Sequence, residues 1–232
     1  MKIYIYVEGP SDVYALRSLF QNWCNQLKKH GHGIKLLSLD DKTKYFRKIG
    51  HRAAEKLVAN EDDLVIGLPD LYPNKVYHQS EYKHDNENEL IDLQRRLVRQ
   101  ALITTQNVSE NRLDQYIDRF YPSTLKHDLE MLLLASVACL REYLRTGDRL
   151  SHGWIRPAEN QNQITPPKRI VEDLFLKYLR RAYKDTTDAP GILKRIKDIH
   201  DLIHNQDGSI NCPVFNEMLS WISIRTGVPA YQ

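Results

Sequence analysis

Apolar residues follow two different spacings in the first 70 positions of the chain. Short apolar runs rich in Ile, Val, Leu and Tyr predict buried strands at 3–7, 34–39 and 63–68. Between these runs, apolar residues recur every three or four positions, which predicts helices over 12–29 and over about 45–57. A strand–helix–strand–helix–strand order needs crossover connections, so the sequence predicts an α/β protein with a mainly parallel sheet flanked by helices.

Beyond residue 70 the pattern becomes mostly helical. Residues 71–89 are polar and predict a long excursion at the sheet edge. Helices are predicted over 89–102, over 113–120, within 125–145, and over 167–183, 190–204 and 213–225, with a loop over 146–167 rich in Gly, Pro, Asn and Gln. The expected domains are an α/β catalytic domain at 1–145 with an edge insertion around 71–122, and a loop and helical C-terminal extension at 146–232 packed on it.

Charge and cysteine content narrow the function classes. With 33 basic and 30 acidic residues the net charge is +3, so a uniformly basic nucleic-acid coat is excluded and any basic surface has to be local. Three cysteines without a CxxC spacing argue against a disulfide framework, which favours a reducing, cytoplasmic location. The longest apolar run, 131–140, is far shorter than the ~20 residues of a membrane span, and no membrane association is expected.

Acidic residues stand where two of the predicted strands end. Glu8 follows the first strand and Asp70 the third, with Asp12 at the start of the helix after Gly9 and Pro10. Ligands gather at the carboxyl ends of parallel strands, and neighbouring strands lie ~4.8 Å apart. Carboxylates so placed suit a hard cation such as Mg²⁺. The alternatives are structural: Asp12 caps its helix, Asp70 is a turn residue after Pro69, and Glu8 is a solvated rim residue.

The residues Val7–Asp12, VEGPSD, resemble the first motif of toprim domains, the catalytic modules of topoisomerases, bacterial primases and OLD-type nucleases. The resemblance implies a toprim-like (Rossmann-like) fold, in which the residue matching Glu8 is a general acid/base or metal ligand. It also implies a DxD motif that carries Mg²⁺. Asp70 matches the first Asp of that motif, whereas Tyr72 stands in place of the second.

Nearly the whole chain resembles a more specific group, the toprim-like bacterial proteins of the domain-of-unknown-function 4276 family. Five motifs carry this resemblance in order: Glu8-Gly9-Pro10-Ser11-Asp12, Asp70-Leu71-Tyr72-Pro73, His127-Asp128-Leu129-Glu130, Thr165-Pro166-Pro167-Lys168-Arg169 and Cys212-Pro213-Val214-Phe215. OLD-type nucleases use an acidic residue at a position comparable to Glu130 to complete a two-metal site. By resemblance, Glu130 is therefore a further ligand and catalytic residue beside Glu8 and Asp70.

Residues from the later motifs are candidates for nucleic-acid binding. If residues 125–130 form a turn, His127 is placed to contact phosphate, and the alternative is that His127 packs and Asp128 caps the following helix. Lys168 and Arg169 open a predicted helix just after Pro167, where backbone N–H groups also attract phosphate. Such contacts would give sequence-independent, salt-sensitive binding. His200 and His204, four residues apart on a predicted helix, have the spacing of a zinc pair but no third ligand.

Together the residues and the resemblance predict a Mg²⁺- or Mn²⁺-dependent nuclease of the toprim type. The expected metal ligands are Glu8, Asp12, Asp70 and Glu130, of which Glu8, Asp70 and Glu130 are the expected catalytic residues. The family resemblance also implies a phage-defence system in which an ABC- or AAA-type ATPase is the partner. Two alternatives stay open: a non-catalytic subunit that binds nucleic acid or a partner through a degenerate site, for which Tyr72 is the main support, and a phosphatase acting on small phosphate esters.

Overall fold

The computed structural model describes residues 1–150, 154–155, 157–161, 164–205 and 207–231. Within them the chain forms two compact units, one of residues 1–13 and 27–124 and the other of residues 14–26 and 125–232. The predicted domains, with their boundary after residue 145, stay a prediction.

The first unit contains a four-stranded parallel sheet with the order β2-β1-β3-β4. The predicted α/β class with a mainly parallel sheet flanked by helices is thereby confirmed. The strands are β1 (Lys2–Val7), β2 (Gly33–Ser38), β3 (Leu64–Leu68) and β4 (Phe120–Pro122). Residues 3–7 of β1 and all five residues of β3 are buried, as expected for central strands covered on both faces.

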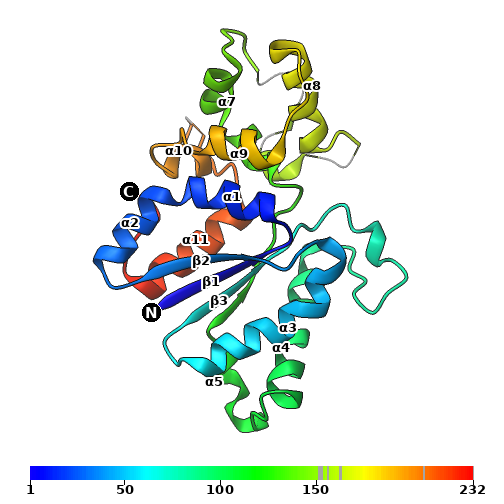
Figure 1. Ribbon diagram of the computed structural model, residues 1–232, viewed down its shortest axis with the longest axis vertical. Helices are drawn as coiled ribbons and strands as arrows, with labels where there is room; N and C mark the ends of the chain where they lie inside the picture. The colour runs from blue at the N-terminus through cyan, green and yellow to red at the C-terminus, as the bar shows by residue number, and fades with distance from the viewer. Residues whose placement is uncertain (151–153, 156, 162–163, 206, 232) are drawn as a thin grey trace. The chain divides into compact units, whose positions relative to one another are not determined.

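Two long helices of this unit cover one face of the sheet: α3 (Lys42–Ala59) and α4 (Glu87–Thr104), which pack against each other (Figure 1). Asp41 caps α3 by accepting a hydrogen bond from the backbone N–H of Lys44, and Asn86 caps α4 in the same way. Shorter helical segments complete the unit: η1 (Lys75–Tyr77), η2 (Glu110–Arg112) and α5 (Leu113–Ile117).

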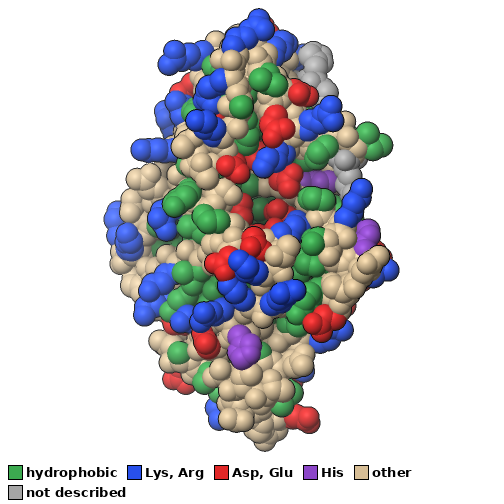
Figure 2. All heavy atoms as spheres, turned by 45° about the vertical axis from the view of Figure 1, so that its right-hand side comes forward, with side chains coloured by type: hydrophobic (Ala, Val, Ile, Leu, Met, Phe, Trp, Pro, Cys, Tyr) green, Lys and Arg blue, Asp and Glu red, His purple; other side chains and the backbone are tan. Residues whose placement is uncertain are grey.

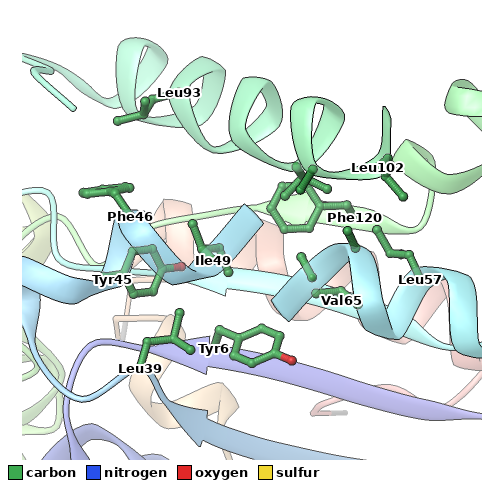
Figure 3. Close-up of a cluster of buried hydrophobic side chains, with 14 of the residues drawn as sticks. Tyr6, Leu39, Tyr45, Phe46, Ile49, Leu57, Val65, Leu93, Leu102 and Phe120 are labelled. Atoms are coloured by element: carbon green, nitrogen blue, oxygen red, sulfur yellow. The ribbon is translucent and has the colours of Figure 1, made fainter. Parts of the chain in front are cut away.

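The core of the first unit lies between this helical layer and the sheet. Figure 3 shows side chains of α3 and α4 pointing towards residues of β1, β3 and β4. The rings of Tyr45 and Phe46 meet edge to face at 5.1 Å, and Ile49 and Leu57 are fully buried one and three turns further along α3. Three-to-four spacing thus gives α3 one apolar face, as the sequence predicts.

The second unit is helical in the residues that the structure describes. It includes residues 14–19 of α1 (Pro10–Leu19) and residues 21–26 of α2 (Gln21–Lys29). The remaining helices are α6 (Glu130–Ala135), α7 (Val137–Leu144), η3 (Ala158–Asn160), α8 (Pro167–Leu179), α9 (Asp185–Leu193), α10 (His200–Ile203) and α11 (Pro213–Thr226). No helix among the described residues has the length and hydropathy to cross a membrane.

Three details of the sequence-based prediction are wrong. The helix predicted over 12–29 is two helices, α1 and α2, which are separated at residue 20. Phe120, predicted at the end of a helix, lies in β4, which pairs with β3 after α5 ends at Ile117. The helix predicted over 190–204 is two helices, α9 and α10, with residues 194–199 between them. The rings of His200 and His204 nevertheless stack, with centroids 4.4 Å apart.

The start of α11 explains one of the late motifs. Cys212 is the buried N-cap residue of this helix, and Pro213 occupies its first turn, where a missing N–H costs nothing. The carboxylate of Glu159, which is fully buried, accepts hydrogen bonds from the backbone N–H groups of Val214 and Phe215 at 2.9 and 3.0 Å. A carboxylate at a helix N-terminus is favourably placed with respect to the helix dipole, so this motif has a structural role.

Candidate functional site

Glu8 is the first residue after β1, and its position follows from the strand and the turn around it. Val7 is the last residue of β1, and Gly9 and Pro10 turn the chain into α1. The end of β2 holds the backbone here, because the Ser38 hydroxyl donates a hydrogen bond to the Glu8 carbonyl at 3.1 Å. The Glu8 side chain therefore projects from the carboxyl end of a central strand.

Asp12 holds the first turn of α1. Its Oδ2 accepts a hydrogen bond from the backbone N–H of Gly9 at 2.9 Å. This is the reciprocal half of a capping box, in which an acidic side chain in the first turn reaches back to the residue that precedes the helix. The capping alternative for Asp12 thus has a direct structural basis, and its role as a metal ligand stays a prediction.

Asp70 follows the neighbouring strand and lies near Glu8. β1 and β3 are parallel neighbours in register, with Val7 beside Leu68, so Glu8 and Asp70 leave the same edge of the sheet. One ammonium group, that of Lys42, lies 3.6 Å from Glu8 Oε2 and 3.9 Å from Asp70 Oδ2. The structure brings these two predicted residues together around a single cation. Glu8, Asp70 and Lys42 are called the carboxylate–lysine cluster below.

The Glu8 carboxyl is poorly satisfied for so deeply buried a group. Glu8 is 7% exposed, and its Oε1 has no hydrogen-bond partner. Burial raises the pKa of Glu8 to about 7, the Lys42 ammonium opposes that rise, and the Asp12 carboxylate adds to it. A buried carboxyl oxygen without a partner costs free energy unless a proton or a cation binds there.

Lys42 is the residue of this site that the sequence analysis missed. It is the first residue of α3, four positions after β2 ends, and its backbone carbonyl accepts a hydrogen bond from the Tyr77 hydroxyl. A signal was present, because β2 is a parallel neighbour of β1 and its following residues reach the same edge of the sheet.

The carboxylate–lysine cluster fits a divalent cation by two observations. An ammonium group already lies between the two carboxylates, and Glu8 Oε1 is a buried oxygen ligand without a partner. Mg²⁺ often binds through one or two carboxylates and completes its shell with water and phosphate oxygens. Among the described residues, no group of three or more His, Cys, Asp and Glu side chains could hold a metal ion.

Glu130 lies in the second unit, where it is the first residue of α6. It is 3% exposed, and burial raises the pKa of its carboxyl to about 7, an effect that the Lys168 ammonium opposes and the Asp128 carboxylate reinforces. The residues 125–130 form no strand, and bends and a turn lead into α6. Glu130 as a metal ligand and catalytic residue stays a prediction.

The other predicted phosphate-binding residues also belong to the second unit. His127 is 6% exposed, and its burial lowers the pKa of the imidazole, which agrees with the packing alternative. Lys168 and Arg169 lie in the first turn of α8. Lys168 Nζ is 3.8 Å from Asp185 Oδ2, and Arg169 is exposed. Both basic residues are placed at a helix N-terminus as predicted, whereas their contact with nucleic acid stays a prediction.

A Glu130→Gln variant is expected to change the pH dependence of stability. Because the folded-state pKa is raised from 4.5 to about 7, Glu130 favours folding below pH 4.5, and this contribution is lost as the pH rises through 7. The unfolding free energy of the variant minus that of wild type should therefore be about 2 kcal/mol larger at pH 8 than at pH 5. Urea unfolding at both pH values measures these free energies, and a Glu217→Gln variant, which changes an exposed residue, is the control. The same difference between Glu130→Gln and wild type at both pH values would contradict the prediction.

Charged side chains of both signs are mixed on the surface. Figure 2 shows Lys and Arg side chains interspersed with Asp and Glu on the face that it draws. This agrees with the net charge of +3 and with the expectation that any basic surface is local.

The chain matches one family of proteins and is similar to solved structures of a bacterial protein. The family described as Domain of unknown function (DUF4276) matches residues 7–223. Among solved structures, the C-terminal region of the Xanthomonas campestris pv. campestris OLD protein, phased with iodine, is 16% identical, with a TM-score of 0.41 and coverage of 97% of this chain and 95% of that chain. The same region phased with mercury is 14% identical, with a TM-score of 0.39 and coverage of 86% and 87%. No curated protein matches the chain.

Proposed function

We propose that this chain, which belongs to the family described as Domain of unknown function (DUF4276), hydrolyses phosphodiester bonds of nucleic acid with the help of a divalent cation. The observation that carries the proposal is the pair of carboxylates, Glu8 and Asp70, that leave neighbouring parallel strands and share one cationic group. The toprim-like VEGPSD motif, which contains Glu8, supports the same reading.

In this proposal Glu8 and Asp70 hold Mg²⁺ or Mn²⁺ in place of the Lys42 ammonium. When bound, such an ion stabilises charge on phosphoryl oxygens and promotes loss of a proton from water. Glu8 has one oxygen facing Lys42 and one without a partner, so a cation and a proton can be held by different oxygens of one carboxyl. Its pKa of about 7 suits proton transfer near neutral pH.

The remaining predicted residues extend this proposal. Asp12 and Glu130 are proposed as further metal ligands, and His127, Lys168 and Arg169 as contacts to the nucleic-acid backbone. The place of Lys168 and Arg169 in the first turn of α8 supports phosphate binding, because free backbone N–H groups and basic side chains act there together. An ABC- or AAA-type ATPase partner and a role in phage defence are proposed from the family resemblance alone.

One observation favours the alternative, a non-catalytic module that binds nucleic acid. Tyr72 replaces the second Asp of the DxD motif, and its hydroxyl donates a hydrogen bond to the backbone carbonyl of Asp85 at 3.0 Å. A phenol is a poor metal ligand at neutral pH, so this position contributes no second carboxylate. A single cation held by Glu8 and Asp70 would then organise binding and not hydrolysis.

Cleavage assays on the wild-type protein separate these functions. Supercoiled plasmid and single-stranded RNA are incubated with Mg²⁺, Mn²⁺, Ca²⁺ or a chelator. We expect cleavage of at least one polymer with Mg²⁺ or Mn²⁺, no cleavage with chelator, and recovery when metal is added in excess. Binding without cleavage under all these conditions would favour the non-catalytic module, and phosphate release from mononucleotides alone would favour a phosphatase.

A further inference from the structure

Lys42 carries the only positive charge that the carboxylate–lysine cluster contains. With both carboxyl groups ionised, the two carboxylates and one ammonium leave one net negative charge in a place where Glu8 is 7% exposed. The Lys42 side chain itself is 21% exposed, against 8% for that of Glu8 and 15% for that of Asp70. The ammonium therefore reaches the carboxylates from the more open side of the cluster.

The base of Lys42 is fixed, whereas its side chain is a flexible stem. Its backbone begins α3, directly after the cap residue Asp41, and is held further by the hydrogen bond from Tyr77. The two other lysines of this turn and the next have different partners: Lys44 pairs with Asp41 and Lys48 with Asp40. Lys42 is thus anchored in the first turn of an 18-residue helix, and its ammonium can move without moving the backbone.

A divalent cation and this ammonium cannot occupy the same position. Both would be attracted by Glu8 and Asp70, and at this separation in a partly buried site they would repel each other strongly. With a dication bound, the two carboxylates are neutralised and Lys42 has no remaining partner among them. A phosphodiester brings the negative charge that then balances the ammonium.

We propose that Lys42 is a phosphate-binding residue that stays paired with Glu8 and Asp70 until a divalent cation binds. The inference rests on the proposed function and deepens it, since it makes backbone phosphate of nucleic acid the ligand that follows the metal. Lys42 pairs with the two carboxylates in the absence of metal, releases them to the metal, and pairs with a phosphate oxygen beside the start of α3. Metal binding and phosphate binding are then coupled through one side chain.

Calorimetric titration with Mn²⁺ tests the first half of this exchange. Lys42→Met should bind Mn²⁺ at least about tenfold more tightly than wild type, because no ammonium has to be displaced. Lys42→Arg, which keeps the charge, should stay much closer to wild type. The matched control is Lys44→Met, which removes the same charge two residues away, from a lysine paired with Asp41, and should change the affinity by less than about threefold.

Binding of a single-stranded DNA oligonucleotide in Ca²⁺ tests the second half. Lys42→Met should weaken this binding about tenfold although it binds metal more tightly, and Lys44→Met should weaken it much less. Unchanged or weaker Mn²⁺ binding by Lys42→Met, or unchanged oligonucleotide binding, would overturn the inference while leaving a metal-dependent nuclease intact. A wild-type protein that binds no Mn²⁺ would overturn the proposed function together with it.

Discussion

Glu8→Gln and Asp70→Asn are each expected to reduce metal-dependent cleavage by at least about a thousandfold, equivalent to ~4 kcal/mol of transition-state stabilisation. Each substitution keeps the size of the side chain and removes one of the two charges that share a cation. A divalent ion bound by a single carboxylate is held weakly, and the charge that it stabilises at the phosphoryl group is then uncompensated. Initial rates on the best polymer substrate, at saturating Mg²⁺, give the measurement.

Glu55→Gln is the control for this pair. Glu55 lies on α3 like Lys42, pairs with Arg52 and has a side chain that is 42% exposed, so its loss should leave the cleavage rate within about twofold. Circular dichroism and urea unfolding confirm that the variants are folded. A folded Glu8→Gln protein that cleaves at the wild-type rate would show that this carboxylate has no part in the reaction.

Gly67→Ala is expected to destabilise the protein by about 3 kcal/mol and to weaken the metal site with it. A Cβ at this position would lie 2.0 Å from Gln94 Oε1 and 2.9 Å from the Tyr45 hydroxyl. Gln94 has little freedom to move, because it is fully buried, accepts a hydrogen bond from Tyr45 and donates one to the Ser123 carbonyl. The strand would have to shift, and it carries Asp70 three residues further on.

Gly33→Ala is the matched substitution in the same sheet. Gly33 begins β2, and a Cβ there would meet no atom within 4 Å, so the change in unfolding free energy should stay within about 0.5 kcal/mol. Urea unfolding of both variants makes the comparison. Equal stabilities of Gly67→Ala and Gly33→Ala would mean that the packing of α4 onto β3 is looser than the structure indicates.

The two central strands of the sheet could be predicted from the sequence, because strands buried on both faces need apolar residues throughout. Central parallel strands have to be apolar throughout, and the runs at 3–7 and 63–68 gave β1 and β3 to within a residue or two. Because parallel strands end at a common edge, their positions also placed Glu8 next to Asp70. Residue type identified the carboxylates at that edge, whereas their role as metal ligands stays a prediction.

The features that the sequence did not predict depend on contacts between residues far apart in the chain, which local sequence patterns do not indicate. β4 has only three residues, ends in Pro122 and follows a short helix, so its apolar residues read as a continuation of helical spacing. Lys42 lies before the helix predicted over about 45–57, and only the folded chain shows that its side chain turns towards two carboxylates. Glu159, whose carboxylate caps α11 from 54 positions before Pro213, likewise had no signal in the sequence.

Mn²⁺ binding followed by electron paramagnetic resonance tests most directly whether Glu8 and Asp70 form one cation site. Free Mn²⁺ gives a strong six-line signal that is lost on binding, so titration of wild type, Glu8→Gln and Asp70→Asn needs no substrate and no partner. We expect the wild type to retain Mn²⁺ and each folded variant to bind it at least about tenfold more weakly. Wild-type affinity in both variants would contradict the account.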